Sequence, residues 1–426
     1  SLAECHAAEL EFGGTGRQRK RIKPHYSMDY YKESLILHKR LKGKIRITPK
    51  LDVRTKEELS LVYSPGMAAP CLEIAEHPEA VYDYTIKSNT VAIVTDGSAV
   101  LGLGNIGARA AIPVMEGKAL LFKRFANIDA FPICIDSQDV DKIVETVRLI
   151  SPVFGGINLE DIAAPRSFEV EERLQDLGIP VFHDDQHGTA IVVLAALINA
   201  AKVLGKSLSD LKVVVNGAGA AGIAIAKLLL CVNQRDNPQC QAVQEVILCD
   251  TKGIVHRERP DLNSAKLAIL NFANLQDRRG DLKVALVGAD VFIGVSVGNL
   301  LTAADIRTMA PDPIIFALAN PEPEIMPAEA YAGGAAIVGT GRSDLPNQVN
   351  NVLGFPGIFR GALDARAKRI TASMKLAAAH AIADHLPHPT RDCVIPASLD
   401  ESVAWRVADA VREVAMKEWV VEVAVA

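Results

Sequence analysis

The sequence of 426 residues lacks several features that mark specialised classes of protein. No apolar run reaches the ~20 residues that a membrane-spanning helix needs, and the first residues have no apolar segment typical of a signal peptide. The seven cysteines are scattered and form no C-x-x-C pair, which does not favour a disulfide framework or a structural zinc site. We therefore expect a cytoplasmic protein in a reducing setting.

An excess of positive charge is also absent. The formal net charge is -5 and the pI is near 6.1, so we expect neither nucleic acid nor a membrane surface as a partner. One local basic run, RQRKRIK at 17–23, is interpreted as part of a solvated, flexible lead-in spanning residues 1–24. The remaining composition, 49% hydrophobic and 23% charged, is typical of a globular chain with two domains.

The most informative stretch is LKVVVNGAGAAGIAIAKLLL, residues 211–230. A short apolar strand pattern meets a helix through Gly217, Gly219 and Gly222, which match G-x-G-x-x-G and predict a dinucleotide site at a helix N-terminus. The next predicted strand ends in Asp250, near the place where such folds contact the ribose. The alternative is a glycine-rich helix that merely packs closely on a sheet.

Strand and helix patterns alternate along most of the chain, which predicts an α/β fold with a doubly wound parallel sheet of the Rossmann type. In that sheet we expect strands at 213–216, 246–249, 290–295, 314–318 and 335–338.

Upstream we expect a second α/β domain, which would bind substrate and metal. Its predicted strands are 91–94, 131–136 and the two short runs INLEDI and PVFHDD, with helices at 140–150 and 189–204. An earlier helix is expected over 29–42, with Tyr30, Leu35, Leu37 and Leu41 available for burial.

The expected domains are 25–188 for substrate and metal, 189–360 for the dinucleotide, and 361–426 for helices that pack back on the first domain.

A second G-x-G-x-x-G occurs at Gly102, Gly104 and Gly107 and competes for the cofactor. The TDGS turn separates it from its strand, and Pro113 falls where a crossover helix would still be running. We interpret these glycines as a turn that approaches substrate closely.

Two pairs of acids, Glu160–Asp161 and Asp184–Asp185, each follow an apolar strand pattern. Adjacent carboxylates in a dry region repel each other, so a divalent cation with oxygen ligands, Mg²⁺ or Mn²⁺, is predicted there. His183 and His187 flank the second pair and raise zinc as an alternative, although no third ligand is clustered with them. Taken singly, each acid is more often a helix cap or a surface residue.

Several further polar residues lie at positions in the sequence that suit a functional site. Lys118 lies in an apolar run, where burial would lower its pKa toward that of a useful base, although a lysine with its head in water is the simpler interpretation. Asn320 ends a predicted strand, and Asn350 and Asn351 precede a turn. Such amides bind hydroxyls and carboxylates, or serve as turn residues.

Together, the sequence motifs around these residues resemble those of the malic enzymes of the compact bacterial type. The matching blocks, which cover about residues 33–385, are YSPGMAAPC, TDGSAVLGLGNIG, PVMEGKALLFK, NLEDIAAPR, HDDQHGTA, GAGAAG, FALANPEPEI and GRSDLPNQVNNVLGFPG. The resemblance implies oxidative decarboxylation of malate to pyruvate and CO₂ with NAD(P)⁺ and Mg²⁺ or Mn²⁺, oxaloacetate decarboxylation, and a dimer.

The resemblance also implies roles for individual residues. Tyr63 and Lys118 match the catalytic tyrosine and lysine, and Asp184 matches the acid that holds the lysine. The matched metal ligands are Glu160, Asp161 and Asp185, and the matched malate contacts are Asn320, which also borders the cofactor, and Asn351. Larger members carry an arginine where Ala99 stands here, so other groups must contribute to carboxylate binding.

The choice between NAD and NADP depends on the residues after the dinucleotide turn. Asp250 favours NAD, whereas Thr251, Lys252 and Lys266 resemble groups that contact a 2′-phosphate, and we favour NADP. Two other functions fit parts of the pattern. An amino-acid dehydrogenase would need no divalent ion, and a nucleotide-sensing protein would bind cofactor without reducing it.

Overall fold

The computed structural model describes residues 30–100 and 102–425, with side chains as far as residue 418. The predicted lead-in at 1–24 and its basic run lie outside the described residues. By its internal contacts the chain separates into residues 1–52 and residues 53–426, and each unit is considered by itself.

The first unit contains one described helix, α1 (Tyr30–Leu41), close to the range predicted. The expectation that its apolar side chains are buried is wrong within that unit. Tyr30 is 72% exposed and Leu35 is 75% exposed, and no residue of α1 is buried. Helical spacing therefore predicted the helix correctly, but it did not predict whether its apolar side chains are buried.

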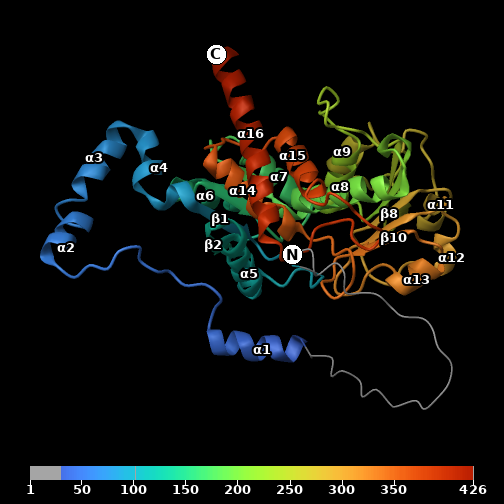
Figure 1. Cartoon of the computed structure of the whole chain (residues 1–426), viewed down its shortest axis with the longest axis horizontal. Helices are drawn as coiled ribbons and strands as arrows, with labels where there is room; N and C mark the ends of the chain where they lie inside the picture. Colours follow the sequence, from blue (N-terminus) through green and yellow to red (C-terminus); the bar gives the residue numbers. More distant parts are fainter. Residues whose placement is uncertain (1–29, 101, 426) are drawn as a thin grey trace. The chain divides into compact units, whose positions relative to one another are not determined.

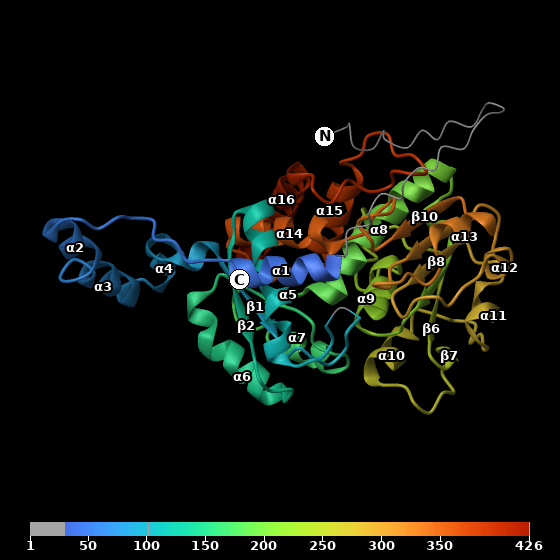
Figure 2. The same cartoon turned by 90° about the horizontal axis from the view of Figure 1, so that it is seen from below.

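The second unit contains two mainly parallel sheets, which Figures 1 and 2 show from two directions. The smaller sheet has the order β2-β1-β3-β4 with every pair parallel. Its strands are β1 (Thr90–Thr95), β2 (Asp129–Cys134), β3 (Gly156–Leu159) and β4 (Val181–His183). Val91 to Val94 are fully buried, as expected of a parallel strand covered on both faces.

The larger sheet has the order β10-β9-β8-β5-β6-β7. Its strands are β5 (Lys212–Asn216), β6 (Glu245–Asp250), β7 (Gly253–Ile254), β8 (Val291–Gly294), β9 (Ile314–Ala317) and β10 (Ile337–Thr340). The order reverses between β5 and β8, which gives the doubly wound topology predicted from the sequence. The antiparallel β7 was not predicted, because two residues are too few to form a pattern.

Helices precede, connect and pack on the two sheets. Those between the first helix and the large sheet are α2 (Lys56–Val62), α3 (Ala68–Glu76), α4 (Val81–Tyr84), α5 (Ala108–Ala126), α6 (Val140–Ile150), α7 (Arg166–Arg173) and α8 (Asp184–Leu204). Those of the large sheet are α9 (Ala220–Leu229), α10 (Ser264–Ile269), α11 (Leu282–Leu286), α12 (Ala303–Ile306) and α13 (Pro327–Ala332). The last three are α14 (Phe355–Asp364), α15 (Ala372–Ala383) and α16 (Glu401–Val425).

Helix α8 connects the two sheets in sequence and belongs to the main hydrophobic core. It has 21 residues and is apolar enough to cross a bilayer by length and composition, contrary to the expectation from sequence runs alone. However, 72% of its most apolar window is buried inside the protein, where α9 and α15 pack against it. A core helix explains these properties without a membrane.

The C-terminal helices return to the first sheet. Helices α14 and α16 pack on each other and on α5, and α15 packs on α8 and α16. Phe355 and Phe359 of α14 make edge-to-face contacts with Phe122 of α5 at centroid distances of 4.8 and 5.4 Å. The C-terminal helices therefore help to fix the helix that carries Lys118.

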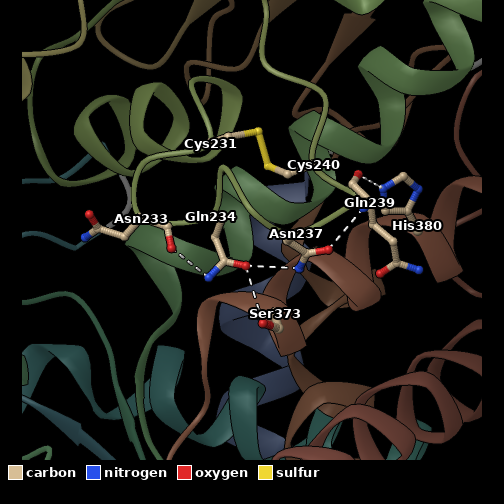
Figure 3. The surroundings of a disulfide bond; sticks show 8 residues. All are labelled: Cys231, Asn233, Gln234, Asn237, Gln239, Cys240, Ser373 and His380. Atoms are coloured by element: carbon tan, nitrogen blue, oxygen red, sulfur yellow. Dashed lines mark hydrogen bonds between the residues drawn. A yellow bond between two sulfur atoms is a disulfide. The ribbon is translucent and has the colours of Figure 1, made fainter.

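A disulfide joins Cys231 and Cys240 in the loop after α9, which the scattered cysteine pattern did not predict (Figure 3). The same loop is tied to α15, because the Ser373 hydroxyl donates to the Gln234 side chain at 3.3 Å and the His380 ring lies 3.0 Å from the Gln239 carbonyl oxygen. Four other described cysteines form no disulfide with one another: Cys71, Cys134, Cys249 and Cys393.

Candidate functional site

The candidate site begins where the strands of the smaller sheet end. Glu160 and Asp161 directly follow β3, and Asp184 and Asp185 directly follow β4, its neighbour in the sheet. Parallel neighbours end at the same edge, so the topology brings the two acid pairs together. The second pair does not lie in a strand end as expected: it forms the first turn of α8, which begins five residues before the predicted start.

Lys118 reaches the acids from α5, in the middle of a helix. Its side chain is 7% exposed, and its ammonium donates to Glu160 Oε1 at 2.9 Å and to Asp184 Oδ2. The ammonium also lies 4.0 Å from the ring centroid of Phe355. The structure therefore excludes a solvated lysine head and places Lys118 at the centre of the acid cluster.

Asp184 is held by further contacts from both sides. Asn351, in the short 3-10 helix η5 (Asn351–Leu353), donates to Asp184 Oδ2 at 2.6 Å. Gly188, one turn along α8, leaves the necessary space, because a Cβ there would lie 1.8 Å from Asp184 Oδ1. Lys118, Asp184 and Asn351, which the resemblance assigned to one site, are thus in direct contact.

The pKa of Lys118 differs from the expectation. Burial alone would lower its pKa, but Asp184 and Glu160 raise the pKa above its ordinary value, so the predicted direction was wrong. Burial raises the pKa of Asp184 to about 8 and also raises the pKa of Glu160, against the effect of Lys118. Lys118 therefore holds its proton more tightly than a free lysine does, and both acids hold theirs more tightly than free carboxyl groups do.

Asp161 and Asp185 complete the cluster of four carboxylates. The Asp161 amide donates to Asp185 Oδ2 at 2.8 Å. Among the described residues, Lys118 is the one cation that forms an ion pair with Glu160 or Asp184. Oxygen donors and surplus negative charge suit a hard divalent cation. Nevertheless, no group of three or more His, Cys, Asp or Glu side chains in residues 30–100 and 102–425 is arranged to hold a metal ion.

The histidines do not form a zinc pair. His187 lies 3.0 Å from Glu171 Oε2 through its Nε2, whereas the fully buried His183 has Nε2 3.5 Å from Asp185 Oδ2. The two rings therefore have different carboxylate neighbours.

The second glycine motif joins the first sheet to the second. Gly102 has φ +70°, and a Cβ there would lie 2.4 Å from the Asn320 carbonyl oxygen, after β9. Gly102 thus lets the two polypeptide segments meet at the carboxyl edges of both sheets. The argument from Pro113 was wrong, because α5 runs through this residue. Asn320 is exposed, and its amide donates to the Leu318 carbonyl at 3.4 Å.

The turn after β5 has the geometry of a dinucleotide site. Gly217 has φ +117°, and a Cβ on Gly222 would lie 2.0 Å from the Gly217 carbonyl oxygen, so both positions require glycine. Gly219 precedes α9, and a Cβ there would meet nothing within 4 Å. Open space at a helix N-terminus fits a pyrophosphate.

Asp250, at the end of β6, has its acceptor positions occupied. Arg259 donates to both carboxylate oxygens at 2.8 and 2.9 Å, Lys266 donates at 2.6 Å, and the Lys252 amide donates at 2.9 Å. Four donors match the roughly four lone pairs that a carboxylate offers. Arg259 and Lys252 also pair with Asp261, so three cations face two acids.

Tyr63 is not brought to the acid cluster. It directly follows α2, its side chain is 64% exposed, and no residue of α2, α3 or α4 is buried. In Figures 1 and 2, α2 and α3 stand apart from α5 and α8. The exposed apolar side chains of this segment include Leu59, Leu61, Val62, Met67 and Leu72.

Sequence reasoning missed several residues that shape the site. Asn158 donates to Glu160 Oε2 at 2.9 Å. Glu171 accepts from the amide of His183, which precedes the second acid pair, and Arg259 donates to Asp250 itself. None of them belongs to a short chemical motif. Only Gly188 had a visible signal, namely a glycine placed early in an otherwise apolar helix.

The fold and the site define a two-sheet α/β protein with a Rossmann-type dinucleotide domain and a lysine–carboxylate centre beside it. Residues 42–175 match the family described as malic enzyme, N-terminal domain, and residues 186–416 match malic enzyme, NAD binding domain. The chain therefore belongs to the malic enzyme family.

Relatives and solved structures agree with this assignment. The chain is 56% identical over 402 residues to the bifunctional malic/malolactic enzyme of Bacillus subtilis, covering 93% of this chain and 96% of that one. It is 46% identical to the NADP-dependent malic enzyme of Escherichia coli, covering 89% of this chain and 51% of that one. The crystal structure of the NAD-dependent malic enzyme from Thermotoga maritima has a TM-score of 0.84 and 50% identity, covering 89% of this chain and 98% of that one.

Proposed function

We propose that this chain catalyses the oxidative decarboxylation of malate to pyruvate and CO₂ with reduction of NAD(P)⁺. The observation that carries the proposal is the buried Lys118, bonded to Glu160 and Asp184 at the edge where the Gly102 turn meets Asn320 of the dinucleotide domain. A base, acids for a metal and a hydride-accepting cofactor are the groups this reaction needs.

The oxygen donors and surplus negative charge of the acid cluster suit a divalent cation, Mg²⁺ or Mn²⁺. Glu160, Asp161 and Asp185 would hold it, since Asp184 is already engaged by Lys118 and Asn351. When bound, such an ion polarises a carbonyl oxygen and stabilises developing negative charge. Its charge would also offset the repulsion that, together with burial, raises the pKa of Asp184 and Glu160.

The residues of the chain would move two protons. Lys118 accepts the hydroxyl proton of malate as hydride departs, and it must first be neutral. Asp184 is in contact with the ammonium and is the group placed to take that proton. Asn351 and Asn320 orient the carboxylates of malate. After CO₂ leaves, the Tyr63 hydroxyl supplies the proton to carbon.

NADP is the cofactor that the surroundings of Asp250 favour. An acid that serves NAD keeps acceptor positions for ribose hydroxyls, whereas Asp250 is saturated by Arg259, Lys266 and the Lys252 amide. Lys252, Arg259 and Lys266 outnumber Asp250 and Asp261 by one positive charge. Net positive charge suits a 2′-phosphate.

A second copy of this chain is the partner that we propose, as a homodimer in the cytoplasm. Because Tyr63 is exposed on a segment that buries no side chain, we infer that this segment docks on the partner copy and supplies Tyr63 to its Lys118. The exposed apolar residues of α2 and α3 would be covered by that contact.

The test is reduction of NAD and of NADP by the full chain with malate, with Mn²⁺ present or removed by a chelator, followed by product analysis. We expect pyruvate, CO₂ and reduced cofactor, loss of activity on chelation, and a higher kcat/KM for NADP. Lactate without net cofactor reduction would contradict the reaction, activity in the chelator would contradict the metal, and a higher kcat/KM for NAD would contradict the cofactor choice. Cofactor binding without turnover would instead indicate a sensing protein.

A further inference from the structure

The corner between β4 and α8 carries two of the four acids and is held by a residue outside the site. Asp184 and Asp185 are the first residues of α8, and the residue before them, His183, makes no side-chain capping bond to that helix. The positions of both carboxylates therefore depend on what fixes the corner.

The contacts that hold this corner come from Glu171 of α7. Its Oε1 accepts from the His183 amide at 3.1 Å, and its Oε2 accepts from the Gln186 side chain at 3.1 Å. The His187 ring lies 2.9 Å from Oε1 and 3.0 Å from Oε2. One carboxylate thus binds the chain immediately before and immediately after the two acids.

Glu171 is well protected in this position. Its side chain is 12% exposed, and charge-assisted hydrogen bonds to a carboxylate shielded from water are stronger than those at the surface. The next residue, Glu172, is exposed and has no hydrogen bond to the corner among the described residues. The two neighbouring glutamates therefore have very different surroundings on the same helix.

We propose that Glu171 is a positioning residue for the divalent cation: by holding His183, Gln186 and His187 it keeps Asp185 aimed at the cation and Asp184 at Lys118. Glu171 itself touches neither the substrate nor the cation. This inference rests on the proposed metal site. Groups behind metal ligands typically change metal affinity 10- to 100-fold when they are removed.

The experiment measures Mn²⁺ binding to the full chain by calorimetry, with no substrate or cofactor, for the wild type, Glu171→Gln and the matched control Glu172→Gln. The glutamine keeps the size of Glu171 but replaces one acceptor oxygen with a donor. We expect the Kd for Mn²⁺ to rise about 10- to 100-fold in Glu171→Gln and to stay within about twofold in Glu172→Gln. Thermal unfolding is recorded for each variant.

Gln186→Met provides a milder second variant, because it removes a single donor and leaves the Glu171 charge in place. Its Kd should rise about two- to fivefold, in line with the loss of one hydrogen bond, and it decides the question if Glu171→Gln does not fold. A lower Tm with an unchanged Kd in these variants would overturn the proposal, since it would show a purely structural role. Failure of the wild type to bind Mn²⁺ would overturn the metal site and this inference together.

Discussion

At the scale of single residues, Gly188 has the sharpest effect on the catalytic geometry. It lies one turn beyond Asp184 on α8, and a Cβ at this position would lie 1.8 Å from Asp184 Oδ1. Since Asp184 is fully buried and bonded to Lys118 and Asn351, it has little room to move. A methyl group at residue 188 must displace either the carboxylate or the helix.

Gly188→Ala is expected to lower kcat by about 100-fold, because a displacement of about 1 Å at a reacting group costs that much. The loss of stability should be small, since overpacking costs about 1–3 kcal/mol and alanine regains about 1 kcal/mol as a helix former. The measurements are steady-state kinetics and thermal unfolding.

Gly354→Ala is the control for that substitution. The nearest atoms to a Cβ at residue 354 lie at 3.6 Å, an ordinary contact. We expect kcat within about twofold of the wild type for this variant. Equal losses in the two variants would contradict the steric explanation for Gly188.

The sequence was a good guide to which ionisable residues lie at the site and a poor guide to their pKa values. Acids after apolar strands could be placed at one sheet edge because parallel strands end together, as Glu160 and Asp184 do. The pKa of Lys118 could not be predicted in direction, since it depends on two carboxylates that lie 42 and 66 residues away in the chain. The roles inferred for Tyr63 and Asn320 stay predictions.

At the scale of elements, periodicity located most strands, but local rules failed inside one helix and at the start of another. Pro113 lies inside α5, whose packing by α14 and α16 outweighs the local cost of proline. Helix α8 starts at Asp184 because acidic residues favour a first helical turn, although the same residues resembled the end of a strand. The strand predicted at 335–338 lies at 337–340.

The loop between α9 and β6 gives a prediction about thiols. Cys231 and Cys240 form a disulfide, so two of the described cysteines are not available as thiols before reduction. Titration of the denatured protein, purified without reductant, is expected to find two fewer thiols than titration after reduction.

Cys231→Ser serves as the control, because it should give the same thiol count before and after reduction. Seven thiols in the untreated wild type would contradict the bond. The cytoplasmic location stays a prediction, and this measurement bears on it because the cytosol keeps most thiols reduced.

At the scale of the whole molecule, one chain does not bring Tyr63 to Lys118. The tyrosine is 64% exposed and the lysine is 7% exposed, in segments that make different contacts. A symmetric dimer resolves this difference if each copy gives its tyrosine to the other, because two-fold symmetry then completes both sites at once.

Mixing two inactive variants tests this arrangement. Tyr63→Phe removes the proton donor, and Lys118→Arg removes the base while keeping a positive charge beside Glu160 and Asp184. In a dimer with shared sites, random mixing should restore about a quarter of wild-type activity, because half the dimers are mixed and each has one intact site. If Tyr63 acts within its own chain, the mixture should be as inactive as its parts.

Helix α8 has a mechanical consequence for any motion during turnover. Its 21 residues form a stiff strut of about 30 Å at the usual rise per residue. One end carries Asp184 and Asp185, and the other end leads to β5, the strand before the dinucleotide turn. The helix therefore sets the distance between the acids and the start of the dinucleotide sheet along its axis. A motion that changes the distance between substrate and nicotinamide would have to rotate the two sheets about α8, with the backbone changes in the loops beside it.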